Sequence, residues 1–161
     1  MIVDDKNQAI INYILQCPQI QNTPLYFNFI NAKDNTAQIV TSSNDRYTEK
    51  PDITGAVEKQ YTFTIMIFKS ITDEAIVKLD GFAHENVEEL SYIQELINWI
   101  AEQDDLKNYP DFGTDCDVDE IRTSEETPRL EAINSQVSPA LAMYSVNIQV
   151  TYIDNSKKLW R

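Results

Sequence analysis

The single histidine, His84, is the first residue to consider for catalysis, because Ser-His-Asp and Cys-His systems use an imidazole as the general base. Its neighbours at positions 82–86 form no companion motif for a nucleophile or a second base. We therefore expect a surface or loop histidine without a catalytic role.

Phosphate-binding loops need closely spaced glycines, and this chain has only Gly55, Gly81 and Gly113. They form neither a GxGxxG nor a GxxxxGK[ST] pattern, so no nucleotide site is predicted at these loops. Asp111, Phe112 and Gly113 match the metal-binding tripeptide of kinases. The chain lacks the other kinase motifs, so this match is interpreted as chance.

Oxygen ligands suited to calcium gather in one short segment, which contains Asp111, Asp115, Asp117, Asp119 and Glu120. Their spacing lacks the central glycine and terminal glutamate of an EF-hand loop, which favours a solvated acidic loop. A carboxylate pair for acid–base hydrolysis cannot be identified among the 26 acidic residues, because the sequence does not show which of them lie close together in space. We expect a non-enzymatic protein with no catalytic residue, no cofactor and no metal.

The two cysteines, Cys17 and Cys116, lie far apart and form no CxxC motif. They are predicted to be reduced, partly buried apolar residues.

Composition predicts a folded, soluble protein with a single domain over residues 1–161. Unbroken apolar runs such as residues 65–68 are far short of the roughly 20 residues of a membrane span. The acidic start of the chain, around Asp4 and Asp5, is unlike a signal peptide and predicts a cytoplasmic location. A net charge of -13 disfavours a nucleic-acid-binding surface, because phosphates would be repelled.

Apolar residues at helical spacing predict a helix over residues 4–15 and a main core helix over residues 85–103. Short β-branched and aromatic runs predict a hairpin from residues 25–30 and 36–41. Residues 59–69 alternate and predict a central strand, and three further strands are predicted over 118–123, 129–137 and 140–153. Polar segments 42–54 and 104–119 are predicted to be loops.

Strands on both sides of a central helix, with another helix before them, indicate an α+β fold. We predict a mostly antiparallel sheet of about five or six strands, with two helices packed on one face.

Gly55 ends a polar segment, and Lys59, Gln60, Tyr61 and Phe63 open the strand that follows it. Further along, residues 97–103 end a helix rich in Trp and Glu, residues 108–112 contain a proline, and residues 140–152 alternate as a final strand. This succession resembles the tail terminator family, also described as minor capsid or neck proteins, of long-tailed phages and prophages of Gram-positive bacteria.

The resemblance implies a structural virion protein whose copies form a ring, expected to be a hexamer. Such a ring caps the tail tube and joins it to head-completion proteins at the virion neck, after assembly in the host bacterial cytoplasm. The passing DNA would not be bound specifically. A closed ring needs a heterologous interface between two different patches, which sheet edges and long polar loops can supply.

Five residues are predicted to contact neighbouring subunits or partner proteins: Tyr47, Lys50, Lys59, Trp160 and Arg161. The last two belong to a basic, aromatic segment that has the composition of an interface anchor. Asp115, Asp117 and Asp119 are predicted to form an acidic loop that faces the channel and repels phosphates. Solubility alone is an alternative explanation for this acidity.

Two other functions fit the same sequence. A second structural interpretation keeps the virion but makes the chain a head-completion or head-tail joining protein, in the neighbouring ring. From a different class, an acidic DNA mimic could inhibit a host nuclease, although a mimic usually carries its carboxylates along helices and this chain has them mainly in predicted loops.

Overall fold

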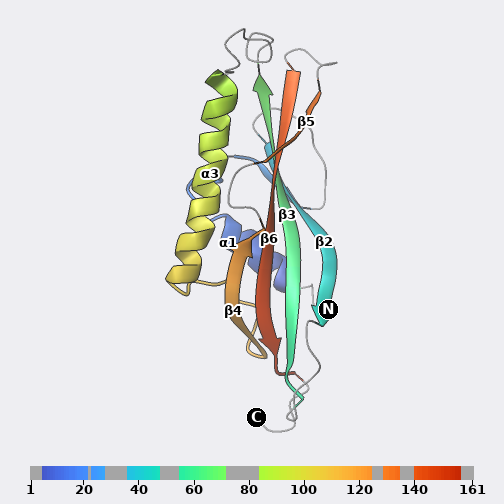
Figure 1. Ribbon diagram of the computed structural model, residues 1–161. Coiled ribbons are helices and arrows are strands. Elements are labelled where there is room, and N and C mark those ends of the chain that lie inside the picture. The colour runs from blue at the N-terminus through green and yellow to red at the C-terminus, as the bar shows by residue number, and fades with distance from the viewer. Residues whose placement is uncertain are drawn as a thin grey trace.

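A six-stranded sheet is the centre of the computed structural model (Figure 1). The structure describes residues 5–21, 23–27, 36–47, 55–71, 84–124, 129–134 and 140–156. Its elements, in chain order, are α1 (Asp5–Ile14), β1 (Leu25–Phe27), β2 (Thr36–Tyr47), β3 (Val57–Ile71), α3 (His84–Asp105), β4 (Cys116–Thr123), β5 (Arg129–Asn134) and β6 (Ala140–Asp154). The predicted α+β class is confirmed.

The strand order across the sheet is β1-β2-β3-β6-β4, and β5 also pairs with β6. β3 and β6, each of fifteen residues, pair along their whole length, from Val57 opposite Asp154 to Ile71 opposite Ala140. Because β3 occupies one side of β6 throughout, β4 and β5 lie end to end along the other side. All pairings except that of β1 with β2 are antiparallel, as predicted.

One face of the two long strands is apolar because their sequences alternate. The side chains on this face are at most 4% exposed: Tyr61, Phe63, Ile65, Ile67, Tyr144, Val146, Ile148, Val150 and Tyr152. On the opposite face, Thr64 Oγ1 donates to Asn147 Oδ1 at 2.6 Å across the same pair of strands. The core therefore lies on one side of the sheet.

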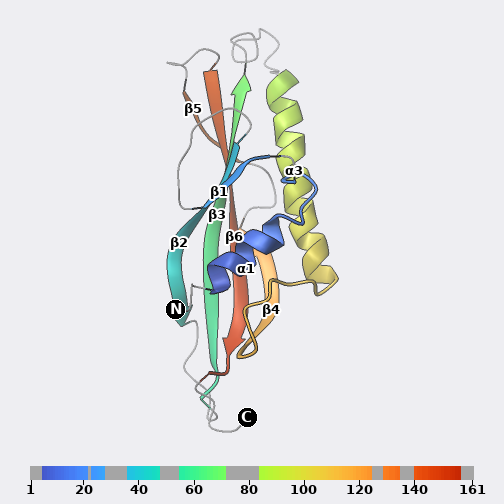
Figure 2. The same cartoon turned by 180° about the vertical axis from the view of Figure 1, so that it is seen from behind.

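Both helices contribute to this core, as predicted. Figure 2 shows α1 crossing the sheet on the side nearer the viewer, with α3 running alongside. The helical residues buried in the core are Ile10, Tyr13, Ile14, Ile93, Leu96, Ile97 and Ile100. The rings of Tyr13 and Trp99 lie 5.3 Å apart, so the two helices also contact each other.

The predicted hairpin is wrong. β1 runs parallel to β2, with Leu25 opposite Ala37 and Phe27 opposite Ile39. The antiparallel partner of β2 is β3, whose Ile65 lies opposite Ile39. This long apolar strand buries far more surface than the neighbouring short run can, so it outweighs the turn-forming residues between β1 and β2.

The loop predicted over residues 42–54 is also partly wrong, because β2 continues to Tyr47. The strand stays paired with β3 through two register shifts, one between Thr41 and Ser43 and one between Ser43 and Arg46. Such bulges let a polar segment without strict alternation continue a ladder. Residues 48–54 lie outside the described part of the chain.

Candidate functional site

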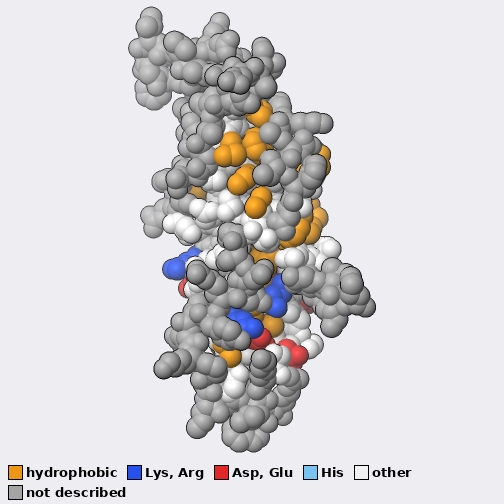
Figure 3. Space-filling model, turned by 90° about the vertical axis from the view of Figure 1, so that its right-hand side faces the viewer, with side chains coloured by type: hydrophobic (Ala, Val, Ile, Leu, Met, Phe, Trp, Pro, Cys, Tyr) orange, Lys and Arg blue, Asp and Glu red, His pale blue; other side chains and the backbone are white. Residues whose placement is uncertain are grey.

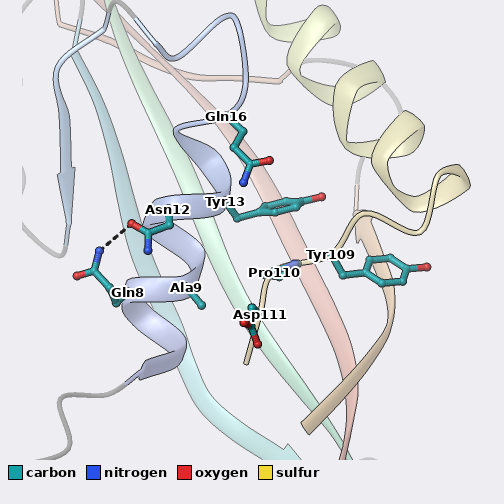
Figure 4. A pocket seen from close by; sticks show the side chains of 8 residues that line it. All are labelled: Gln8, Ala9, Asn12, Tyr13, Gln16, Tyr109, Pro110 and Asp111. Atoms are coloured by element: carbon teal, nitrogen blue, oxygen red, sulfur yellow. Dashed lines mark hydrogen bonds between the residues drawn. The ribbon is translucent and has the colours of Figure 1, made fainter. Parts of the chain in front are cut away.

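A cavity of about 300 Å³ opens between α1 and the segment that follows α3 (Figure 4). It is lined by Gln8, Ala9, Asn12, Tyr13, Gln16, Tyr109, Pro110 and Asp111. Tyr13 and Pro110 are buried, whereas the glutamine, asparagine and aspartate side chains are exposed. The cavity, named the α1 pocket below, therefore has an apolar floor and a polar rim.

One wall of the α1 pocket is a row of amide side chains. Gln8 and Asn12 are four residues apart on α1, and Gln16 continues this spacing in the turn beyond the helix. Gln8 Nε2 donates to Asn12 Oδ1 at 2.9 Å. Ile10 and Ile14 on the other side of α1 are fully buried, so the apolar stripe of the helix turns the amides outward. The sequence could predict this spacing, but it could not predict the opposite wall of the pocket.

The opposite wall is fixed by the way α3 ends. Asn108 N donates to Gln103 O and Lys107 N to Asp104 O, with Lys107 at a φ of 56°. This is a Schellman motif, with lysine at the left-handed position that glycine usually fills. Tyr13 Oη donates to Asn108 O at 2.9 Å and ties the returning chain to α1. The wall is thus held in place by the protein itself.

The two phenols of the pocket are neutral hydrogen-bond donors. Burial, with a smaller contribution from Asp104, raises the pKa of Tyr13 above its ordinary value of 10.0. Desolvation and a hydrogen bond with Asp104 likewise raise the pKa of Tyr109. Asp111 is the one charged side chain of the lining. The pocket thus offers aromatic contact, amide hydrogen bonds and one carboxylate.

The cysteines and the histidine lie outside the lining of the α1 pocket. Cys17 is buried and its thiol donates to Gln19 Oε1 at 3.0 Å. Burial raises the pKa of Cys17 to about 11, so the thiol is protonated and unreactive at neutral pH. Cys116 is half-buried at the start of β4. His84 begins α3, and its side chain is outside the described residues.

The predicted acidic loop is only partly a loop. Asp115 precedes β4, but Asp117 and Asp119 lie on this strand with exposed side chains. A register shift at Asp119 marks a bulge, after which Ile121 faces the core with 1% exposure. Asp117 Oδ2 also accepts a hydrogen bond from Asn155 Nδ2 at 2.9 Å. This segment is a strand because it pairs with β6, and its acidic composition alone could not predict that pairing.

The predicted interface residues do not form one described cluster. Tyr47 is the last residue of β2, where its backbone pairs with that of Lys59. Lys50, Trp160 and Arg161 lie outside the described residues. These three therefore stay predictions.

Lys59 forms an ion pair inside the protein. Its Nζ donates to Asp154 Oδ2 at 2.9 Å, and the two side chains are 17% and 13% exposed. Its charge is therefore partly compensated by β6, which lowers its value as a contact for a neighbouring subunit.

Acid should weaken the folded state through Asp154. Desolvation alone would raise the pKa of Asp154, but hydrogen bonds from Lys59 and Ser156 outweigh it and lower the pKa from 3.8 to about 2. Because the folded state binds this proton less tightly than the unfolded state, the stabilisation is complete above about pH 4 and is lost as the pH falls toward 2. We expect Asp154→Asn to lower the free energy of unfolding by about 1–2 kcal/mol at pH 7.

Urea denaturation of both proteins between pH 7 and pH 2 measures this effect. Asparagine keeps an acceptor for the backbone N–H of Ser156, so the variant isolates the charge. A stability difference that stays constant down to pH 2 would contradict the assignment.

The outer edge of β4 is capped by residues at the end of α3. Ile121 N donates to Asp104 Oδ1 at 3.1 Å. The hydroxyl of Tyr109 lies within donating distance of Asp119 O, at 3.0 Å, and of Asp104 Oδ1, at 3.1 Å. Backbone groups that would otherwise be offered to a further strand are thus bound by side chains. Neither Asp104 nor Tyr109 was identified from the sequence, because their partners are far along the chain.

Within the described ranges, no three His, Cys, Asp or Glu side chains come close enough together to hold a metal ion. No helix in the same part of the chain is long and apolar enough to cross a membrane. No protein family model matches the chain, and no curated protein matches its sequence.

Proposed function

We propose that the protein is a phage tail terminator, a structural subunit whose copies form a ring that caps the tail tube and joins it to head-completion proteins. The resemblance supports this through four segments of the sequence: 47–68, 97–103, 108–112 and 140–152. The structural observation that supports it most is the difference between the two edges of the sheet.

The β4 edge is capped, as described above, whereas β1 covers only part of the opposite edge. β1 pairs with Ala37 to Ile39 of the twelve-residue β2. Within the described part of the chain, no further strand pairs with this side of segment 42–47. An edge of this kind can accept a strand or loop from another subunit, because backbone donors and acceptors lie along it.

The side of the molecule next to β2 also exposes apolar groups. The three side chains of β1, Leu25, Tyr26 and Phe27, are only half-buried. Figure 3 faces this side and shows most of the visible hydrophobic side chains in its upper half and the charged ones in its lower half. Apolar edge strands are typical of surfaces that become covered on assembly.

Edges that differ in this way suit a ring. A heterologous interface joins one patch to a different patch, and it closes when the rotation between copies divides a full turn evenly. The β1–β2 edge supplies one patch, and the surface formed by α1 and the end of α3 supplies the other. Six copies are expected from the resemblance.

The acidic residues at and just before the start of β4, two of which are exposed, are proposed to line the channel wall. Asp115, Asp117 and Asp119 carry negative charge that would repel the phosphates of passing DNA. In this arrangement β4 faces the lumen, and the genome passes without a specific contact.

Electron microscopy and mass measurement of the purified protein test the proposal. We expect rings with a mass of six subunits, either alone or after addition of the tail tube protein encoded in the same genome, and we expect Asp117 and Asp119 to face the lumen. The ring should stop polymerisation of the tube protein. A protein that stays monomeric with tube and head-completion proteins, or that closes no ring on them, would refute the proposal.

The same preparation separates a terminator from its neighbours in the neck. A terminator should co-purify with the tube protein, whereas a head-tail joining protein should co-purify with the portal complex. Binding to the portal alone would move the proposal to the adjacent ring.

A further inference from the structure

The α1 pocket has the size and lining of a receptor for one aromatic side chain. An apolar cavity of roughly 150 Å³ is enough to bind benzene, so the volume of about 300 Å³ leaves room for an indole ring. The floor of Tyr13 and Pro110 offers aromatic and apolar contact, and the amide row at the rim offers hydrogen-bond acceptors. Interface anchors are typically held by a buried floor and a polar rim of this kind.

The surroundings of the pocket favour a cationic partner. Asp111 stands at the rim, and Asp104 and Asp105 end α3, with Asp104 Oδ1 3.1 Å from the hydroxyl of Tyr109. Lys107 is the one basic residue among positions 101–120. A ligand with an aromatic ring flanked by positive charges would therefore be complementary to the site.

This chain contains one segment of that composition, residues 157–161, which read Lys-Lys-Leu-Trp-Arg in a protein with a net charge of -13. It follows Asn155, whose backbone N–H donates to Asp115 O at 2.7 Å at the end of the sheet. Five extended residues span about 17 Å, enough to reach into an adjoining subunit. Figure 1 shows β6 running past α1 and ending beyond it.

We propose that residues 157–161 of one copy dock into the α1 pocket of the next copy in the ring. Trp160 occupies the cavity, with its indole N–H donating to an amide oxygen of the rim. The neighbouring lysine and arginine side chains lie against Asp111 and the end of α3. This inference rests on the proposed function, since it assigns a donor and an acceptor patch to the interface between copies.

A peptide experiment tests the docking without requiring a ring. A fluorescein-labelled peptide of residues 156–161 is titrated into the full-length Trp160→Ala variant, whose own segment lacks the anchor. We expect saturable binding, weakened about tenfold or more by the additional change Asp111→Lys. Glu95→Lys makes the same charge change at an exposed position of α3 outside the pocket and should leave binding unchanged. Absence of binding, or equal loss with both lysine variants, overturns the proposal.

A mixing experiment tests whether the segment comes from a neighbour. Trp160→Ala keeps an intact pocket and Asp111→Lys keeps an intact segment, so each variant should associate with itself about tenfold more weakly than wild type. A mixture of the two should form mixed pairs, because one functional segment then meets one functional pocket. Trp160→Phe keeps an aromatic ring and should restore part of the association.

The outcomes separate the two proposals. Variants that form rings as readily as wild type would overturn the docking and leave the ring intact. Peptide binding by a protein that forms no assembly, with or without its tube and head partners, would refute the ring, and the docking between copies with it. Peptide binding by Trp160→Ala without mixed pairs would mean that the segment fills the pocket of its own chain, which also overturns the docking between copies.

Discussion

Replacing Leu96 with alanine is expected to lower the free energy of unfolding by about 2–5 kcal/mol. Leu96 is fully buried on α3, in the core that this helix shares with α1 and the sheet. Its truncation removes apolar contacts and leaves a cavity that the long strands cannot close, because they are held by pairing along their whole length. Chemical denaturation of both proteins at neutral pH measures the loss.

Leu106→Ala is the matched control. This leucine follows α3 and is 65% exposed, so the same change in side chain should alter stability by no more than about 0.5 kcal/mol. Equal effects of the two substitutions would mean that α3 does not pack on the sheet as described.

Replacing Asp104 with alanine should open the capped edge of β4. One carboxylate oxygen of Asp104 accepts the hydrogen bond of Ile121 N and lies 3.1 Å from the Tyr109 hydroxyl. Leaving such a backbone donor without its partner costs about 1–3 kcal/mol. Removal of a negative charge from the C-terminal end of α3 offsets about 0.3–1 kcal/mol of this loss. We expect a net destabilisation, with faster hydrogen exchange at the Ile121 amide.

Two substitutions separate the hydrogen bond from the charge. Asp104→Asn keeps an acceptor and should retain most of the stability and the slow exchange of Ile121. Asp105→Ala removes the neighbouring exposed carboxylate at the same helix end and should be neutral or slightly stabilising. Unchanged exchange at Ile121 in Asp104→Ala would show that the edge is not capped by this side chain.

The capped edge also bears on assembly. A subunit whose two sheet edges were equally open could pair edge to edge without limit. With Asp104 and Tyr109 on the β4 edge, strand addition is directed to the β1–β2 side. The proposed contact between residues 157–161 and the α1 pocket would add a second contact between copies, made by side chains.

Local pattern was sufficient for the elements with strong periodicity. The helix predicted over 85–103 is α3, His84–Asp105, and the strand predicted over 59–69 is β3, Val57–Ile71. The last strand, predicted over 140–153, is β6, Ala140–Asp154. In each case, one face of the segment must be buried, and the spacing of its apolar residues reveals which period satisfies that requirement.

Local sequence patterns could predict only one wall of the α1 pocket. The amide row of Gln8, Asn12 and Gln16 could be predicted from their spacing of four residues. The other wall depends on the left-handed backbone of Lys107, at a position where a glycine would have indicated the turn. Tyr13 and Asn108, which join the two walls, are far apart in the chain.

The amino-acid order alone gave the class of the fold, its charge and most of its helices and strands, because burial of a periodic face is a local requirement. Folding in three dimensions decided which strand pairs with which: it set β1 parallel to β2 in place of a hairpin, carried β2 through polar residues to Tyr47, and placed Asp117 and Asp119 on β4. These outcomes depend on competition between distant segments for the same sheet edge. The edge pairs with the segment that buries the most apolar surface. A local sequence pattern cannot predict this outcome, because the alternative strands are far apart in the chain.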